Sequence, residues 1–200
     1  MAKRSVILGI DPGTRITGYG VIDVDTQPID FGCIRPPPKL ELAERYKIIF
    51  DGVEALIEKY APVAIAVESQ FVMKNPQSAI KLGMAKGMVY LAAVRKSIPI
   101  YEFTPKKAKL AVVGHGGASK IQVQKMIQTL LRLPTLPEPE DAADALALAI
   151  CCVHQLRLKN VRIDQRDIKR KNPRQSYRGN GGHRLPPLHS VEHLHTPTSP

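Results

Sequence analysis

Four acidic residues stand in apolar surroundings, where an unpaired carboxylate is costly. Asp11 ends the apolar run of residues 5–11, and Glu68 ends a second apolar run later in the chain. Asp141 and Asp144 are three residues apart in a segment with helical character, so both carboxylates lie on one helix face. Taken singly, each acid has an ordinary explanation in a turn, a helix N-terminus or an ion pair with a lysine.

Taken together, the four acids predict a metal site. If the two apolar runs are neighbouring strands and the helix packs against them, the four carboxylates converge. Such a cluster takes up protons unless a cation neutralises it. A set of oxygen ligands favours Mg²⁺ or Mn²⁺ over zinc or copper. Two such ions about 4 Å apart promote phosphodiester hydrolysis. We therefore expect two Mg²⁺ ions per site, with Mn²⁺ as a substitute.

The charge of the chain indicates a polyanionic partner. The 200 residues carry 29 Lys and Arg against 18 Asp and Glu, a net charge of +11. Residues 1–158 carry +5 of this charge and residues 159–200 carry +6. A basic tail on an ordinary domain would account for the +6 of residues 159–200 but not for the +5 of residues 1–158. Positive charge on the folded part can form a patch that neutralises phosphates. Charge and acid cluster together predict a metal-dependent nuclease.

The order of elements predicts how the acids are positioned. Residues 5–11, 18–23 and 31–35 are expected to form three strands of an antiparallel meander. Further strands are predicted at residues 63–67 and 98–103, and helices at 42–60, 76–97, 105–113, 121–131 and 140–158. This order is typical of an α/β domain on a mixed five-stranded sheet flanked by helices. We expect a nuclease domain at residues 1–158 and a basic, disordered tail at 159–200.

The chain shows no sign of a membrane or secreted protein. No run of about 18 apolar residues is present, so no membrane partner is expected. The first residues lack the apolar region of a secretory signal. Three cysteines, two of them adjacent, suit neither a disulfide framework nor a zinc site. The expectation is a soluble protein of the reducing cytoplasm.

Five motifs resemble the bacterial RuvC family of Holliday-junction resolvases. They are ILGIDPGT at residues 7–14 with GYGVI at 18–22, ESQFVMKN at 68–75, AIKLG at 79–83, VVG at 112–114 and DAADALA at 141–147. They occur in the family's order from residue 5 to about residue 157, and five motifs in register are highly specific.

The resemblance implies a ribonuclease H-like fold and a homodimer. It implies an endonuclease that resolves four-way (Holliday) DNA junctions during homologous recombination and DNA repair. The reaction would be symmetrical, Mg²⁺-dependent nicking of two strands of like polarity. Cooperation with the branch-migration complex of the RuvA and RuvB proteins is also implied. No family role extends to the tail at residues 159–200.

The resemblance also assigns roles to individual residues. The family's catalytic and metal-binding acids match Asp11, Glu68, Asp141 and Asp144, the set that their apolar context had indicated. The residue used against unstacked bases at the junction matches Phe71, and the family's DNA-binding lysines match Lys109 and Lys120.

Several alternatives remain at this stage. Residues 9–14 are also similar to the phosphate loop of actin-like and sugar-kinase ATPases, although the chain lacks a second nucleotide-binding half. A non-enzymatic DNA- or RNA-binding domain fits the charge but leaves four acids unexplained beside a polyanion. Phe71 has an alternative role as core filler. Gly83 and Gly87, inside a predicted helix, suit either packing within the chain or a dimer interface.

Overall fold

The sheet has five strands and is mixed, as the sequence predicts. The computed structural model describes residues 5–69 and 75–158, so Phe71 and the segment 159–200 lie outside the described residues. The strands are Val6–Asp11 (β1), Thr17–Asp23 (β2), Pro28–Ile34 (β3), Ala64–Glu68 (β4) and Ile100–Phe103 (β5). Their order in the sheet is β3-β2-β1-β4-β5. The first three strands form the expected antiparallel meander, and β4 and β5 continue the sheet in parallel with β1.

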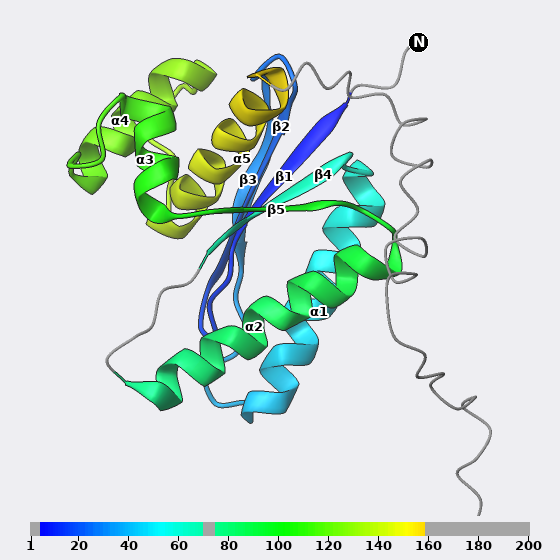
Figure 1. The fold of residues 1–200 in the computed structure, drawn as a ribbon. Helices are drawn as coiled ribbons and strands as arrows, with labels where there is room; N and C mark the ends of the chain where they lie inside the picture. Colours follow the sequence, from blue (N-terminus) through cyan, green and yellow to red (C-terminus); the bar gives the residue numbers. More distant parts are fainter. Residues whose placement is uncertain (1–4, 70–74, 159–200) are drawn as a thin grey trace, which may run out of the picture.

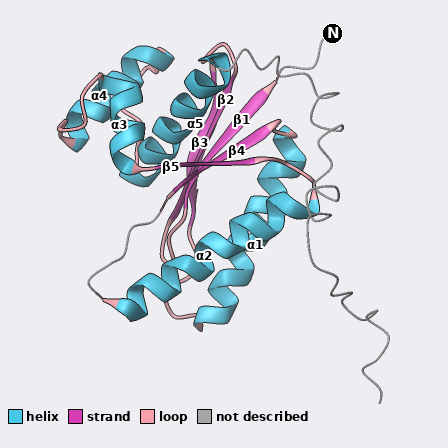
Figure 2. Ribbon diagram, in the orientation of Figure 1, coloured by secondary structure: helices cyan, strands magenta, loops and turns pink. Residues whose placement is uncertain are grey.

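Helices cover both faces of this sheet (Figures 1 and 2). They are Leu42–Tyr60 (α1), Pro76–Arg95 (α2), Pro105–Val113 (α3), Lys120–Leu131 (α4) and Glu140–Leu158 (α5). The α1 and α2 helices pack together on one face, and α5 lies on the other face beneath α3 and α4. Because α5 is enclosed by the sheet and by two helices, it is apolar on nearly all sides.

Alternate residues of the central strands belong to two hydrophobic cores, one on each face of the sheet. Ile7 and Ala66 join the core with α5, whereas Leu8 and Ile65 join the core with α1 and α2. Side chains of a strand point to opposite faces in turn, so a strand covered on both faces has to be apolar throughout. This explains why β1 and β4 are continuous apolar runs up to the acid that ends each strand.

The α5 helix approaches the sheet unusually closely. A Cβ atom at Gly9 of β1 would lie 2.0 Å from the carbonyl oxygen of Ala145. A Cβ atom at Gly20, the register partner of Gly9 on β2, would lie 2.8 Å from the backbone nitrogen of Leu146. The two glycines therefore allow helix backbone and strand backbone to touch.

The β3 strand begins three residues before its predicted start. The Asp23 carboxylate accepts hydrogen bonds from the backbone N–H groups of Asp25 (3.0 Å) and Gln27 (2.8 Å). This compact turn lets the chain re-enter the sheet at Pro28, and a proline is tolerated there because β3 is an edge strand. Residues 28–30, which were predicted to belong to the polar connection, are therefore part of the strand.

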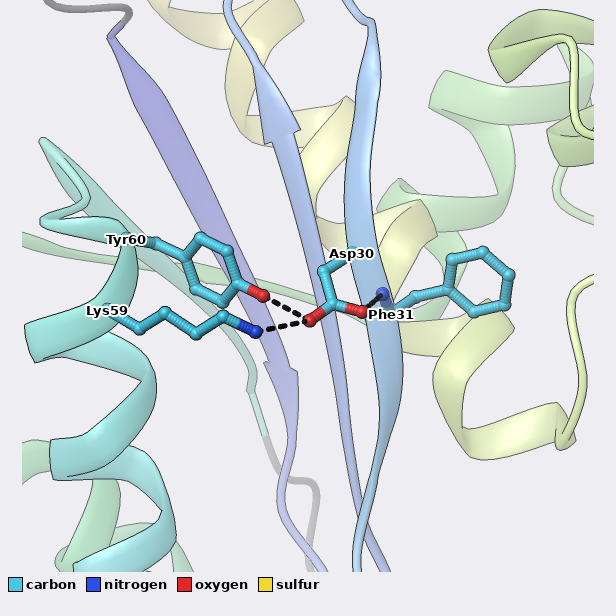
Figure 3. A network of polar contacts seen from close by, with 4 residues as sticks. All are labelled: Asp30, Phe31, Lys59 and Tyr60. Atoms are coloured by element: carbon cyan, nitrogen blue, oxygen red, sulfur yellow. Dashed lines mark hydrogen bonds and ion pairs between the residues drawn. The ribbon is translucent and has the colours of Figure 1, made fainter.

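The edge strand β3 is fixed to α1 through Asp30 (Figure 3). Its carboxylate accepts a hydrogen bond from the Tyr60 hydroxyl and lies 3.4 Å from the Lys59 ammonium. The Phe31 ring points away from this contact in Figure 3 and packs against the core that contains α5. Asp30 and Phe31 thus contact the helix layers on opposite faces of the sheet.

The N-terminus of α2 agrees with the sequence. The Asn75 side chain accepts hydrogen bonds from the N–H groups of Gln77 (3.0 Å) and Ser78 (3.4 Å), with Pro76 in the first turn. Asn75 is therefore the N-cap, as its type predicts. Among residues 5–69 and 75–158, no helix has both the length and the apolar character needed to cross a bilayer.

Candidate active site

Two of the predicted acids end neighbouring parallel strands. Asp11 is the last residue of β1 and Glu68 is the last residue of β4. The residues before them, Ile10 and Val67, are register partners, so both acids lie at the same end of the sheet. Both side chains are half-buried. Ligand sites of open α/β sheets are typically found at the carboxyl ends of parallel strands.

The turn after Asp11 is held by its own residues. The buried Thr17 hydroxyl donates to the Gly13 carbonyl oxygen (2.9 Å) and lies 3.3 Å from the Gly13 N–H. A Cβ atom at Gly13 would lie 2.2 Å from the Ile16 carbonyl oxygen, so the turn needs glycine there. The chain therefore leaves β1 in a fixed direction, and the Asp11 side chain faces the site from a rigid strand end.

The other two acids come from the start of α5. Asp141 and Asp144 lie in its first turns and are both half-buried. The close packing of this helix on β1 and β2 carries its N-terminus to the same sheet end as Asp11. The structure thus places all four predicted acids at the same end of the sheet.

The other three acids act on the Asp11 carboxyl through their charge. Burial, followed by the negative charges of Glu68, Asp144 and Asp141, raises the pKa of Asp11 from its ordinary value of 3.8 to about 8. Lys120 opposes this shift. The Asp11 carboxyl therefore holds a proton at neutral pH.

Two other acids respond to the same neighbours. Burial and then Asp144 raise the pKa of Glu68, and Lys86 and Lys109 oppose the rise. Burial is also the main reason why the pKa of Asp144 is raised, with Lys120 opposing it. Buried carboxylates that repel one another in this way are typical of functional sites.

Both predicted DNA-binding lysines lie beside the acids. The Lys120 ammonium is 2.6 Å from a carboxylate oxygen of Glu140, and this contact raises the pKa of Lys120. The Lys109 ammonium is 3.5 Å from the Ala118 carbonyl oxygen and is near enough to Glu68 and Asp144 to influence both. Positive charge is thus available next to the carboxylates. Phe71 lies outside the described residues.

The donor set suits a hard divalent cation, although the carboxylates do not form a closed ligand shell. In the ranges 5–69 and 75–158, no group of three or more His, Cys, Asp or Glu side chains is arranged to hold a metal ion. The carboxylates offer only oxygen, the donor that Mg²⁺ and Mn²⁺ prefer. A cation would also offset the burial and the mutual repulsion that together raise the pKa of Asp11. The residues present therefore fit such an ion, provided that their side chains move closer on binding.

Two residues near the site were not predicted from the sequence. Lys86 of α2 is only 16% exposed, lies 2.8 Å from Glu102 of β5 and acts on Glu68. No local spacing signals this contact, because its members are on separate elements. Glu140 was also overlooked, although an acid directly before Asp141 was visible in the sequence.

Comparison with known proteins agrees with this fold and site. The family described as crossover junction endodeoxyribonuclease RuvC matches residues 7–152. A protein of that name from Protochlamydia amoebophila (strain UWE25) is 59% identical over 154 residues, which are 76% of this chain and 92% of the relative. Another, from Heliobacterium modesticaldum, is 46% identical over 154 residues, 76% of this chain and 95% of the relative.

Solved structures agree in fold. One described as T. thermophilus RuvC in complex with Holliday junction substrate has a TM-score of 0.72 at 32% identity, covering 78% of this chain and 96% of the other. The yeast mitochondrial Holliday junction resolvase Ydc2 has a TM-score of 0.56 at 19% identity, covering 84% of each chain, and shows the fold alone.

The fold is ribonuclease H-like, as the motifs predict. The chain belongs to the RuvC family of crossover junction endodeoxyribonucleases. This membership identifies the chain as a nuclease and excludes both the ATPase and the non-enzymatic alternatives.

Proposed function

We propose that this protein resolves four-way DNA junctions by symmetrical nicking of two strands of like polarity. The observation that carries the proposal is the placement of four carboxylates at one sheet end, where burial and then the neighbouring carboxylates raise the pKa of Asp11. Two lysines beside these acids supply the positive charge that a DNA substrate requires. The names of the relatives and the junction in the Thermus structure support the same substrate.

The cofactor in this proposal is Mg²⁺, with two ions per active site and Mn²⁺ as a substitute. Asp11 with Asp141 or Asp144 would hold one ion, and Asp11 with Glu68 would hold the other. When bound, the ions supply an activated water for in-line attack on the phosphate and stabilise the leaving 3′-oxygen. The products would carry 5′-phosphate and 3′-hydroxyl ends.

The chain's own residues prepare the reaction. Asp11 has to release its proton before it serves as a ligand, because its pKa is about 8. Lys109 and Lys120 neutralise phosphates and the negative charge that grows in the transition state. Lys120 has to break its ion pair with Glu140 before it binds a DNA phosphate. Breaking this pair costs little free energy, because exposed ion pairs are weak. Phe71 stacks against an unstacked base at the junction.

A dimer built through α2 would supply two active sites for paired nicks. In the described part of the chain, a Cβ atom at Gly83 or Gly87 would meet nothing within 4 Å, so packing inside the chain does not explain these glycines. Large apolar residues of α2 are exposed alongside them: Ile80, Met84, Leu91 and Val94. An exposed apolar helix face with small residues suits close approach of a second copy.

Residues 1–158 form the nuclease domain, and residues 159–200 form a basic tail that adds DNA affinity. The protein acts in the cytoplasm on four-way DNA junctions, together with the RuvA–RuvB branch-migration complex.

The test separates binding from cleavage. We expect Asp11→Asn to reduce Mg²⁺-dependent junction cleavage by more than about 100-fold, because changes to outer-shell partners of metal ligands alone cost 10- to 100-fold. Junction binding in chelator should survive, since the substitution adds no negative charge. Asp51→Asn removes an exposed acid of α1 that pairs with Lys47, and serves as the matched control. Retained cleavage in the Asp11 variant would contradict the assignment.

A further inference from the structure

We infer that Gly18 is a positioning residue for the active site, because only a glycine there lets Asp141 lie beside Asp11. The inference rests on the proposed function and deepens it. Gly18 touches neither DNA nor metal in this account. It acts through the backbone of α5.

The evidence is the path of the two backbones. Gly18 is the register partner of Asp11 across β1 and β2. A Cβ atom at Gly18 would lie 2.0 Å from the carbonyl oxygen of Asp141, 2.4 Å from its carbonyl carbon and 3.1 Å from the nitrogen of Ala142. All three are backbone atoms, so no side-chain rotation relieves the clash. The strand or the first turn of the helix has to move.

The location of this contact distinguishes Gly18 from the other glycines beneath α5. Gly9 and Gly20 contact Ala145 and Leu146, farther along the helix, and support its packing in the core. Gly18 contacts the residue that bears one of the four carboxylates. Since Asp11 is fixed on the neighbouring strand, the Gly18 contact sets the distance between the two acids.

A methyl group at Gly18 should therefore lift the first turn of α5 from β2. This movement takes Asp141 away from Asp11, whereas Lys109 and Lys120 belong to α3 and α4, outside the turn that moves. The cation site loses its geometry, whereas the DNA-binding charge does not change. We expect Gly18→Ala to weaken divalent-cation binding roughly 10- to 100-fold, the range seen when the support of metal ligands is disturbed.

Electron paramagnetic resonance of Mn²⁺ measures this binding directly in the full-length chain. The matched control is Gly32→Ala of β3, where the new Cβ atom would meet side-chain atoms only, the Tyr19 hydroxyl at 2.9 Å and two Tyr19 ring carbons at 3.1 and 3.2 Å. Gly18→Ala should bind Mn²⁺ at least about 10-fold more weakly than the wild type, and Gly32→Ala should match the wild type. Junction binding in chelator should stay within about 2-fold for both variants. Equal Mn²⁺ affinity in a folded Gly18→Ala protein would overturn the inference.

A second measurement covers the case in which Gly18→Ala does not fold. In the wild-type protein, nuclear magnetic resonance should show a nuclear Overhauser contact between the Gly18 α-protons and the Ala142 amide proton, because the two backbones approach closely there. The absence of this contact would overturn the inference. Both readouts are independent of cleavage. If the wild type bound Mn²⁺ as expected but did not cut junctions, the proposed function would fail while the role of Gly18 in the cation site stood.

Discussion

Asp11 and Glu68 each follow one member of a register pair, Ile10 and Val67, on two adjacent parallel strands. Their backbones are therefore held side by side by the hydrogen bonds of the sheet. This rigid pair is half of the candidate site, and the first turns of α5 supply the other half. Placement of functional groups on strand and helix ends, rather than on long loops, favours precise geometry.

The raised pKa of Asp11 predicts that metal binding releases a proton. The folded, metal-free chain keeps the Asp11 proton up to about pH 8, whereas the unfolded chain loses it near pH 3.8. The stability that this proton contributes is therefore complete below about pH 3.8 and is lost as the pH rises to about 8 and beyond. Mg²⁺ affinity should increase over the same window, because the ion competes with the proton.

Calorimetry in two buffers of different ionisation enthalpy measures the released proton. At pH 7 we expect about one proton per wild-type chain from Asp11 on cation binding, and much less from Asp11→Asn. The thermal midpoint of the metal-free wild type should fall between pH 5 and 8 more steeply than that of the variant. Identical proton release in the two proteins would contradict the electrostatic account.

The exposed face of α2 predicts a dimer that a single charge disrupts. Leu91 is 50% exposed on α2, and Leu110 is 51% exposed on α3, which covers the opposite face of the sheet. Leu91→Glu should therefore give a monomer by light scattering at micromolar concentration, whereas Leu110→Glu should remain dimeric. The Leu91 variant should also lose paired nicking. A wild-type monomer, or a dimeric Leu91→Glu protein, would argue against this interface.

Phe71 is predicted to act on the junction after binding. Base–aromatic stacking contributes about 1–3 kcal/mol, so Phe71→Ala should slow cleavage roughly 5- to 150-fold. Its effect on junction affinity should be smaller, and Phe71→Tyr should restore the rate because the ring is kept. The core-filler alternative predicts instead a lowered thermal midpoint with wild-type cleavage by the folded fraction.

The basic segment 159–200 predicts a strong dependence of DNA binding on salt. Its nine Lys and Arg residues would release counterions on contact with DNA. A chain ending at Leu158 should show a shallower slope of log affinity against log salt while retaining metal-dependent cleavage. Replacing the nine basic residues with Gln separates the effect of charge from that of length. A slope that does not change would exclude this role.

Most elements could be predicted because they obey simple periodicities. The strands that end at Asp11 and Glu68 are apolar runs, and Asn75 with Pro76 marks a helix start by residue type alone. The start of β3 could not be predicted in this way. Asp30 interrupts the apolar pattern of that strand, and its partner Tyr60 lies 30 residues further along the chain.

The candidate site was likewise predictable from the sequence only in part. The four acids were visible because charge is unexpected in apolar surroundings. The contact of Gly18 with the Asp141 backbone was not visible, because it depends on the path of α5 over the sheet. Lys86 is a similar case, since its approach to Glu68 requires the positions of α2 and β4 in space.

Strand-resolved nicking of a synthetic four-way junction tests the central claim most directly. A linear duplex of the same sequence is incubated alongside, and both substrates are assayed with Mg²⁺ and with chelator. We expect paired nicks at symmetrical positions on two strands of like polarity, only in the junction and only with Mg²⁺. Junction binding without cleavage in Mg²⁺ or Mn²⁺, or equal cutting of the duplex, would contradict the account.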